Sequence, residues 1–107
     1  MIPQKTIEDL INKHKFLEKE LSSGSLDKKF FAEKSKEYSD LNEIIDIAKR
    51  YISYEENKLE LQKILNDKNS DIELVKMAEI ELNDLNLEKE KNEKKLKLFL
   101  LPKDEAD

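Results

Sequence analysis

Residues 26–65 decide the fold, and they read LDKKFFAEKSKEYSDLNEIIDIAKRYISYEENKLELQKIL. The stretch contains neither glycine nor proline, the residues that most often end a helix. Its apolar residues recur at the helical intervals of three, four or seven. They form two rows: Phe31, Tyr38, Leu41, Ile45, Ala48, Ile52 and Leu59, and Phe30, Ile44, Tyr51 and Leu65. Two adjacent rows predict a long central helix with one partner helix on each side.

The composition favours an all-α fold. The chain has 107 residues with one glycine and two prolines, which leaves room for few turns and argues against an all-β fold. Charged residues make up 42% of the chain, as in long solvated helices. A helix over residues 26–65 would be roughly 60 Å long, longer than a compact domain of this size is wide. We therefore expect an elongated antiparallel three-helix bundle, a coiled-coil-like arm with a long central helix.

Two loop signals separate the central helix from its neighbours. Residues 22–25, SSGS, follow a first apolar stripe over residues 7–21, and the polar residues 66–71 precede a third helix that ends before Pro102. Ser25 or Asp27 is expected to cap the central helix, and Ser70 or Asp71 the third.

Short loops make both outer helices antiparallel to the central one. Counted from their turns, they overlap on the central helix at residues 38–45, so the best-packed core is expected there. The seam of the third helix is polar at Lys89 and Asn92, where we expect this helix to leave the core. The full seam is Val75, Ala78, Leu82, Leu85, Lys89, Asn92, Leu96 and Phe99.

Several classes of function are disfavoured by the composition. The net charge is −5 and Arg50 is the only arginine, which argues against a nucleic-acid-binding surface and so against a DNA partner. The absence of cysteine excludes disulfides and thiolate metal sites. No apolar run approaches the roughly 20 residues of a membrane span, and residues 1–10 lack a signal core. We expect a cytoplasmic protein with no membrane partner.

No residue pattern points to catalysis. His14 is the only histidine and lies on the first apolar stripe, so we expect a partly buried structural role. Acidic pairs such as Glu55-Glu56, and Glu79 with Glu81, are expected on solvated faces, because a thin helical rod offers no cleft that would shift their pKa values. We predict no enzyme activity and no catalytic, cofactor-binding or metal-binding residues.

Aromatic side chains are the candidate contact residues. Tyr38 and Tyr51 lie on the core-facing rows and are expected to pack, whereas Tyr54 is expected to be exposed. Phe30 and Phe31 are adjacent, so they point about 100° apart on a helix. One of them is expected to face the first helix and the other a neighbouring surface.

Residues 98–102, LFLLP, form an apolar cluster near the end of the sequence. Four consecutive apolar residues cannot all face one seam of a helix. They either close the core over Ile7, Leu10 and Leu41 or face a following domain, and the two interpretations are compatible. The sequence alone does not decide between them.

Three stretches resemble a known family. Residues 34–41, KSKEYSDL, resemble the S-K-E-Y-x-x-L element of the N-terminal domain of bacterial peptide chain release factor 1. Residues 100–107, LLPKDEAD, resemble the L-L-P-K-D-x-x-D signature that ends that domain. Residues 71–82, DIELVKMAEIEL, resemble the helix start D-x-E-L-x-x-M-A-E-x-E-L between them. The three stretches occur in the family's order and extend over nearly the whole chain.

The resemblance implies the helical N-terminal domain of a release factor over residues 1–101, with residues 102–107 starting a linker to absent catalytic domains. Such factors terminate translation at UAG and UAA codons through Gly-Gly-Gln and Pro-x-Thr motifs, neither of which is present here. The implied partners are the ribosome at its stalk base, namely ribosomal protein L11 and adjacent rRNA, and the remaining domains of the same factor. The alternative is a free-standing helical adaptor or self-associating coiled-coil protein. The contacting face, the orientation toward absent domains and the oligomeric state of the fragment do not follow from the sequence.

Overall fold

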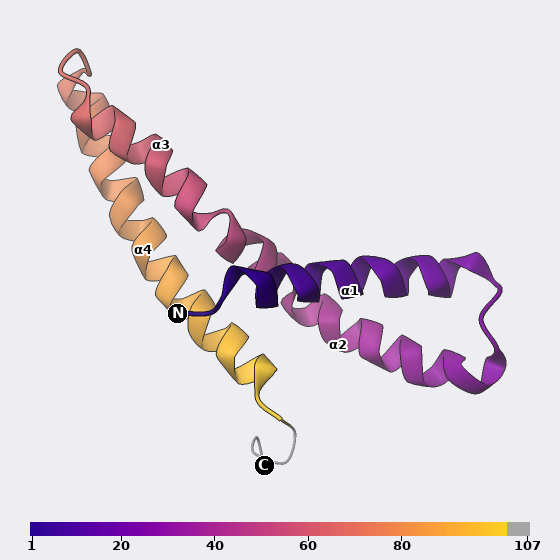
Figure 1. The fold of residues 1–107 in the computed structure, drawn as a ribbon. Helices are drawn as coiled ribbons and strands as arrows, with labels where there is room; N and C mark the ends of the chain where they lie inside the picture. The colour runs from indigo at the N-terminus through magenta and orange to yellow at the C-terminus, as the bar shows by residue number, and fades with distance from the viewer. Residues whose placement is uncertain (103–107) are drawn as a thin grey trace.

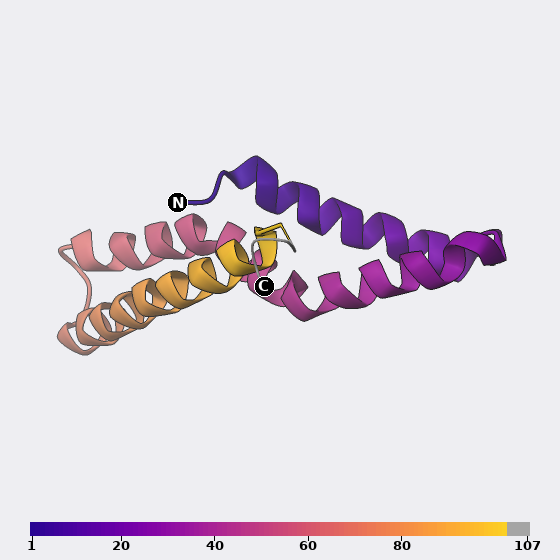
Figure 2. The same ribbon diagram turned by 90° about the horizontal axis from the view of Figure 1, so that it is seen from below.

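The computed structural model describes residues 1–102, and this part of the chain is all-α, as predicted. Its four helices are α1 (Gln4–Ser23), α2 (Lys28–Ile52), α3 (Tyr54–Asn66) and α4 (Ile72–Leu100). They form two antiparallel hairpins, α1 with α2 and α3 with α4, which extend in different directions from a common junction (Figures 1 and 2). The molecule measures 62 × 34 × 20 Å, which confirms the expected elongated arm. The predicted linker residues 103–107 lie outside the described residues.

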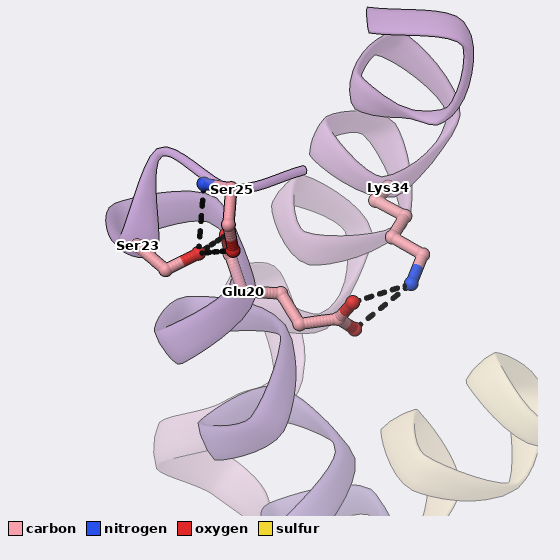
Figure 3. A network of polar contacts seen from close by, with 4 residues as sticks. All are labelled: Glu20, Ser23, Ser25 and Lys34. Atoms are coloured by element: carbon pink, nitrogen blue, oxygen red, sulfur yellow. Dashed lines mark hydrogen bonds and ion pairs between the residues drawn. The ribbon is translucent and has the colours of Figure 1, made fainter. Parts of the chain in front are cut away.

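The α1–α2 hairpin forms where the serine- and glycine-rich segment predicts a turn. Gly24 ends α1 with φ +72°, the left-handed conformation that glycine adopts without steric cost. Asp27 caps α2, and its side chain accepts a hydrogen bond from the backbone N–H of Lys29 at 3.4 Å. Behind the turn, the Lys34 ammonium donates to both carboxylate oxygens of Glu20 and ties the two helices together (Figure 3).

The central helix is not continuous, which corrects the prediction of one helix over residues 26–65. It is divided at Ser53, whose N–H donates to the Lys49 carbonyl and whose hydroxyl donates to the Arg50 carbonyl. A serine hydroxyl bonded to its own helix backbone favours a bend. Leu59 of α3 is 57% exposed although its row would have placed it in the core, because α1 packs along α2 and does not extend along α3.

The α3–α4 hairpin turns in the predicted polar loop. Asp71 is the N-cap residue of α4, but its side chain makes no capping hydrogen bond. The Ser70 hydroxyl instead donates to the Ile64 carbonyl near the end of α3 and so holds the turn closed. The bend at Ser53 directs α3 along α4, and the two helices lie side by side in both views (Figures 1 and 2).

The core lies where the two hairpins meet. Its buried members come from the N-terminal segment, α1, α2 and α4, and they are Ile2, Ile7, Ile44, Ala48 and Leu96. Leu41 and Ile45 are also buried, so the predicted window of residues 38–45 is partly right. The centre is shifted toward Ala48 because α4 crosses α2 there, and alanine allows close approach between helices.

The polar part of the α4 seam stays in the core, contrary to the prediction. Asn92 is buried, with 8% of its surface exposed, and Lys89 is half-buried. The Lys89 ammonium lies 4.8 Å from the centre of the Tyr54 ring. A cation–π contact lets a charged residue occupy a seam position without leaving the interface.

Replacing Leu96 with alanine tests the core. Leu96 is fully buried, so Leu96→Ala is expected to lower the free energy of unfolding by about 2–5 kcal/mol. Leu98→Ala is the matched control on the same helix, because Leu98 is 65% exposed and its truncation should change stability by less than about 0.5 kcal/mol. Urea unfolding followed by far-ultraviolet circular dichroism measures both. Equal losses in the two variants would contradict this location of the core.

Candidate interaction surfaces

The junction of the hairpins is held by a group of polar contacts around two tyrosines. Tyr54 is buried, and its hydroxyl donates to the side-chain oxygen of Asn86 on α4. The prediction that Tyr54 is an exposed contact residue is therefore wrong. Tyr51 is half-buried against the core as expected, and its hydroxyl accepts a hydrogen bond of 3.2 Å from the N–H of Ile2. A buried tyrosine needs a partner for its hydroxyl, and α4 and the N-terminal segment supply them.

Ion pairs reinforce the same junction. Arg50 on α2 pairs with Glu88 on α4 at 2.6 Å. The terminal amine of Met1 lies 3.0 Å from Glu93, which also pairs with Lys97 at 3.1 Å. The hydrogen bond from the terminal amine, and then the one from Lys97, hold the pKa of Glu93 below its ordinary value of 4.5.

A hollow of about 280 Å³ opens at this junction. Its lining includes Arg50, Tyr54, Glu88 and Lys89. Its two cations are already engaged, since Arg50 pairs with Glu88 and Lys89 lies over the Tyr54 ring. The charged groups that line the hollow are therefore already engaged in the polar contact between the two hairpins.

His14 has the structural role that the sequence predicts. It is half-buried, its ring is stacked on Tyr38 with centroids 4.8 Å apart, and its Nε2 is hydrogen-bonded to the Asn42 side chain. Among residues 1–102, no group of three His, Cys, Asp or Glu side chains is arranged to hold a metal ion.

The acidic pairs lie on solvated faces, as predicted. Glu55 and Glu56 are exposed in the first turn of α3, where negative charge complements the helix dipole. Glu79 and Glu81 are exposed on α4. These carboxylates belong to solvated surfaces of the helices.

The S-K-E-Y element builds the α1–α2 interface. Lys34 pairs with Glu20, Glu37 pairs with Lys13, and Tyr38 stacks on His14. Leu41, at the end of the element, is buried. The motif is therefore a packing element that fixes the register of the first hairpin.

Exposed aromatic residues lie on the first hairpin. Phe16 on α1 is 61% exposed, and Phe30 and Phe31 at the start of α2 are 44% and 48% exposed. Neither of the adjacent phenylalanines is buried against α1. The Lys29 ammonium lies 5.7 Å from the Phe30 ring. This end of the hairpin is the better candidate for an aromatic contact surface than Tyr54.

Part of the apolar cluster at the end of α4 closes the core, and part of it stays exposed, as expected for residues that face a following domain. Phe99 packs against the core, and together with Leu10 and Leu41 it lines a groove of about 540 Å³ between the first hairpin and α4. Leu98 and Leu101 remain 65% and 43% exposed. One residue thus closes the core, and its neighbours stay available to another surface.

The outer face of α4 carries an apolar line that the sequence reading missed. Met77, Ile80 and Leu87 are 58%, 63% and 58% exposed. They lie three and seven residues apart, the same helical spacing that identified the buried seam. The helical spacing of these three residues is visible in the sequence, but periodicity alone does not show which of the two apolar lines of a helix is buried.

Comparison with known proteins gives the family. The PCRF domain model matches residues 10–107. Peptide chain release factor 1 of Pelagibacter ubique is 73% identical over the whole chain, which spans 30% of that relative's length. The factor from Orientia tsutsugamushi (strain Boryong) is 41% identical over 92% of the chain, and the one from Wolbachia pipientis is 39% identical over 97% of it. The chain spans 27% and 29% of these two relatives. No solved structure matches at comparable significance.

The fold and the family match together define a helical PCRF domain. The chain belongs to the peptide chain release factor family. The part of release factor 1 that it resembles is the N-terminal part. This confirms the resemblance carried by the S-K-E-Y and L-L-P-K-D elements. None of the described helices is both long and apolar enough to cross a membrane.

The Glu93 contacts predict a specific pH dependence. A folded-state pKa below the unfolded value stabilises the fold above the unfolded pKa, and this stabilisation is lost as the pH falls through the folded pKa. Glu93→Gln should therefore lower stability at pH 7, by less than about 1 kcal/mol for a pair at the surface. Its stability should also fall less than that of the unaltered chain between pH 5 and pH 3.

Urea unfolding at several pH values in that range measures the effect. Glu90→Gln, at an exposed position on the same helix, is the control and should keep the pH profile of the unaltered chain. Identical profiles for the Glu93 and Glu90 variants would show that the junction ion pair does not contribute.

Proposed function

We propose that the chain is the N-terminal domain of a release factor that terminates translation at UAG and UAA codons. In this proposal it serves as an accessory arm that contacts the ribosome. The observation that carries the proposal is the 73% identity to a release factor 1 over the whole chain, of which it spans 30%. The two-hairpin shape, 62 Å long, supports a role in reaching a distant surface.

The arm itself is proposed to be non-catalytic. Its single glycine, Gly24, is flanked by serines at the turn of the first hairpin, so the chain has no Gly-Gly-Gln sequence. Neither Pro3 nor Pro102 begins a Pro-x-Thr tripeptide. Peptidyl-tRNA hydrolysis and codon reading are thus assigned to other domains of the same factor, joined through a linker that begins at residues 102–107.

The proposed partners are the stalk base of the large ribosomal subunit, namely ribosomal protein L11 and the adjacent rRNA, in the cytoplasm. The exposed phenylalanines of the first hairpin and the exposed apolar line of α4 support contact with a macromolecule. Exposed apolar residues that lie in line are more typical of interaction surfaces than of isolated helices in water.

A release assay tests the proposal. The 107-residue chain should co-sediment with ribosomes from Pelagibacter ubique, yet it should release no peptide from ribosomes halted at UAG or UAA. The complete release factor 1 of that organism, which should release peptide, is the positive control. Stop-codon-dependent release by the chain alone would contradict its non-catalytic role, and a failure to co-sediment would contradict ribosome binding.

A self-associating helical adaptor is the second candidate, favoured by the exposed line of Met77, Ile80 and Leu87. Sedimentation equilibrium over a range of concentrations separates the two proposals. A release factor arm should remain a monomer of 12.6 kDa, whereas an adaptor should form a tight dimer.

A further inference from the structure

Two opposite faces of α4 carry apolar residues, and among residues 1–102 only one of these faces is packed against another helix. Ala78 is buried, and Leu82 and Leu85 are half-buried on the seam toward α3. At 100° per residue, Met77, Ile80 and Leu87 fall within one quadrant on the other side of the helix. These three residues are the outer line of α4. The fold does not need them, because the seam already joins α4 to its neighbours.

The charge around the outer line is strongly acidic. Residues 71–84 contain one lysine, Lys76, and five exposed carboxylates: Asp71, Glu73, Glu79, Glu81 and Asp84. Glu60 on α3 adds to them, since it lines a hollow of about 340 Å³ together with Glu81 and Asp84. Residues 60–84, which also include Lys63 and Lys68, contain seven acids and three lysines, so this end of the hairpin is net acidic and disfavours nucleic-acid phosphates.

The sign of the charge changes along α4. From residue 89 onward the helix carries five lysines, Lys89, Lys91, Lys94, Lys95 and Lys97, and only two acids before its end. The acidic half therefore lies toward the end of the α3–α4 hairpin, and the basic half lies at the junction with the first hairpin (Figure 1). This division limits the acidic surface to the part of the hairpin that extends away from the core.

We propose that the outer line of α4 binds a lysine- and arginine-rich protein surface, with Met77, Ile80 and Leu87 as its apolar anchors. The inference rests on the proposed function, within which this partner is a protein component of the ribosome and not rRNA. Charge complementarity selects the partner: a basic protein surface pairs with the five carboxylates, while the apolar line supplies contact area. A second copy of this chain would place the same acidic residues opposite one another, and their like charges would repel.

Site-specific crosslinking tests which partner touches the outer line. A photoreactive phenylalanine analogue replaces Ile80 in the 107-residue chain, and ribosomes from Pelagibacter ubique are the probe. The expected product is a crosslink to a ribosomal protein. The control carries the same analogue at Asn12, an exposed position on α1, and should not give that product. A crosslink to rRNA, a crosslink to a second copy, or no crosslink while the chain still co-sediments would overturn the inference.

Two substitutions give an independent test by affinity. Ile80→Asp should weaken ribosome binding at least about tenfold, as expected for an anchor at the centre of an interface. Asn12→Asp, which adds the same charge at an exposed site on the other hairpin, is the control and should bind as the unaltered chain does. Circular dichroism should show both variants folded, since both positions are exposed.

Charge reversal distinguishes a protein partner from RNA. Asp84→Lys should lower ribosome affinity if the facing surface is basic protein and raise it if the surface is rRNA. A raised affinity, or unchanged binding in both Ile80→Asp and Asp84→Lys, would overturn the inference while leaving the proposed function in place. Loss of co-sedimentation by the unaltered chain would instead overturn both.

Discussion

The packing of α4 across the first hairpin is the interaction on which the rest of the structure depends. Each hairpin alone is a pair of antiparallel helices with one apolar seam. They become one body because Leu96 of α4 meets Ile7 of α1 and Ala48 of α2 in a single buried cluster. Burial at this crossing also positions the polar contacts around it, including Tyr54 with Asn86 and Arg50 with Glu88. The arm therefore has one core and two extensions that are held mainly by pairwise helix contacts.

Much of this arrangement follows from the sequence. The helical intervals predict the apolar seam residues of α4, and all of these are buried or half-buried. The loops at Gly24 and around Asn69 follow from residues that favour turns, and the cap at Asp27 follows from its position before an apolar run. These features depend on local chemistry that acts within a few residues of the chain.

Features that depend on tertiary contacts were not predictable in the same way. The break at Ser53 lies in a stretch without glycine or proline, and α3 beyond the break packs along α4. The burial of Tyr54 likewise depends on another helix, because Asn86 and Lys89 of α4 contact its hydroxyl and its ring. The sequence shows that the outer line of α4 is apolar. That this line is exposed becomes clear only when the structure shows that the other apolar line, the seam, faces α3.

The architecture is that of an elongated arm that presents surfaces. The acidic carboxylates are spread over solvated faces, and the single histidine is held between Tyr38 and Asn42. The described residues form two hairpins that extend from one core and expose apolar and aromatic side chains along their length. The two hairpins also differ in character, with phenylalanines on the first and an acidic, apolar face on the second.

Competition on the ribosome tests this account most directly. The 107-residue chain is added in increasing amounts to a release assay driven by the complete release factor 1 of Pelagibacter ubique. If the chain is a ribosome-binding arm without catalytic function, it should slow release in proportion to its occupancy and cause none itself. Unchanged release at concentrations where the chain co-sediments with ribosomes would contradict the account.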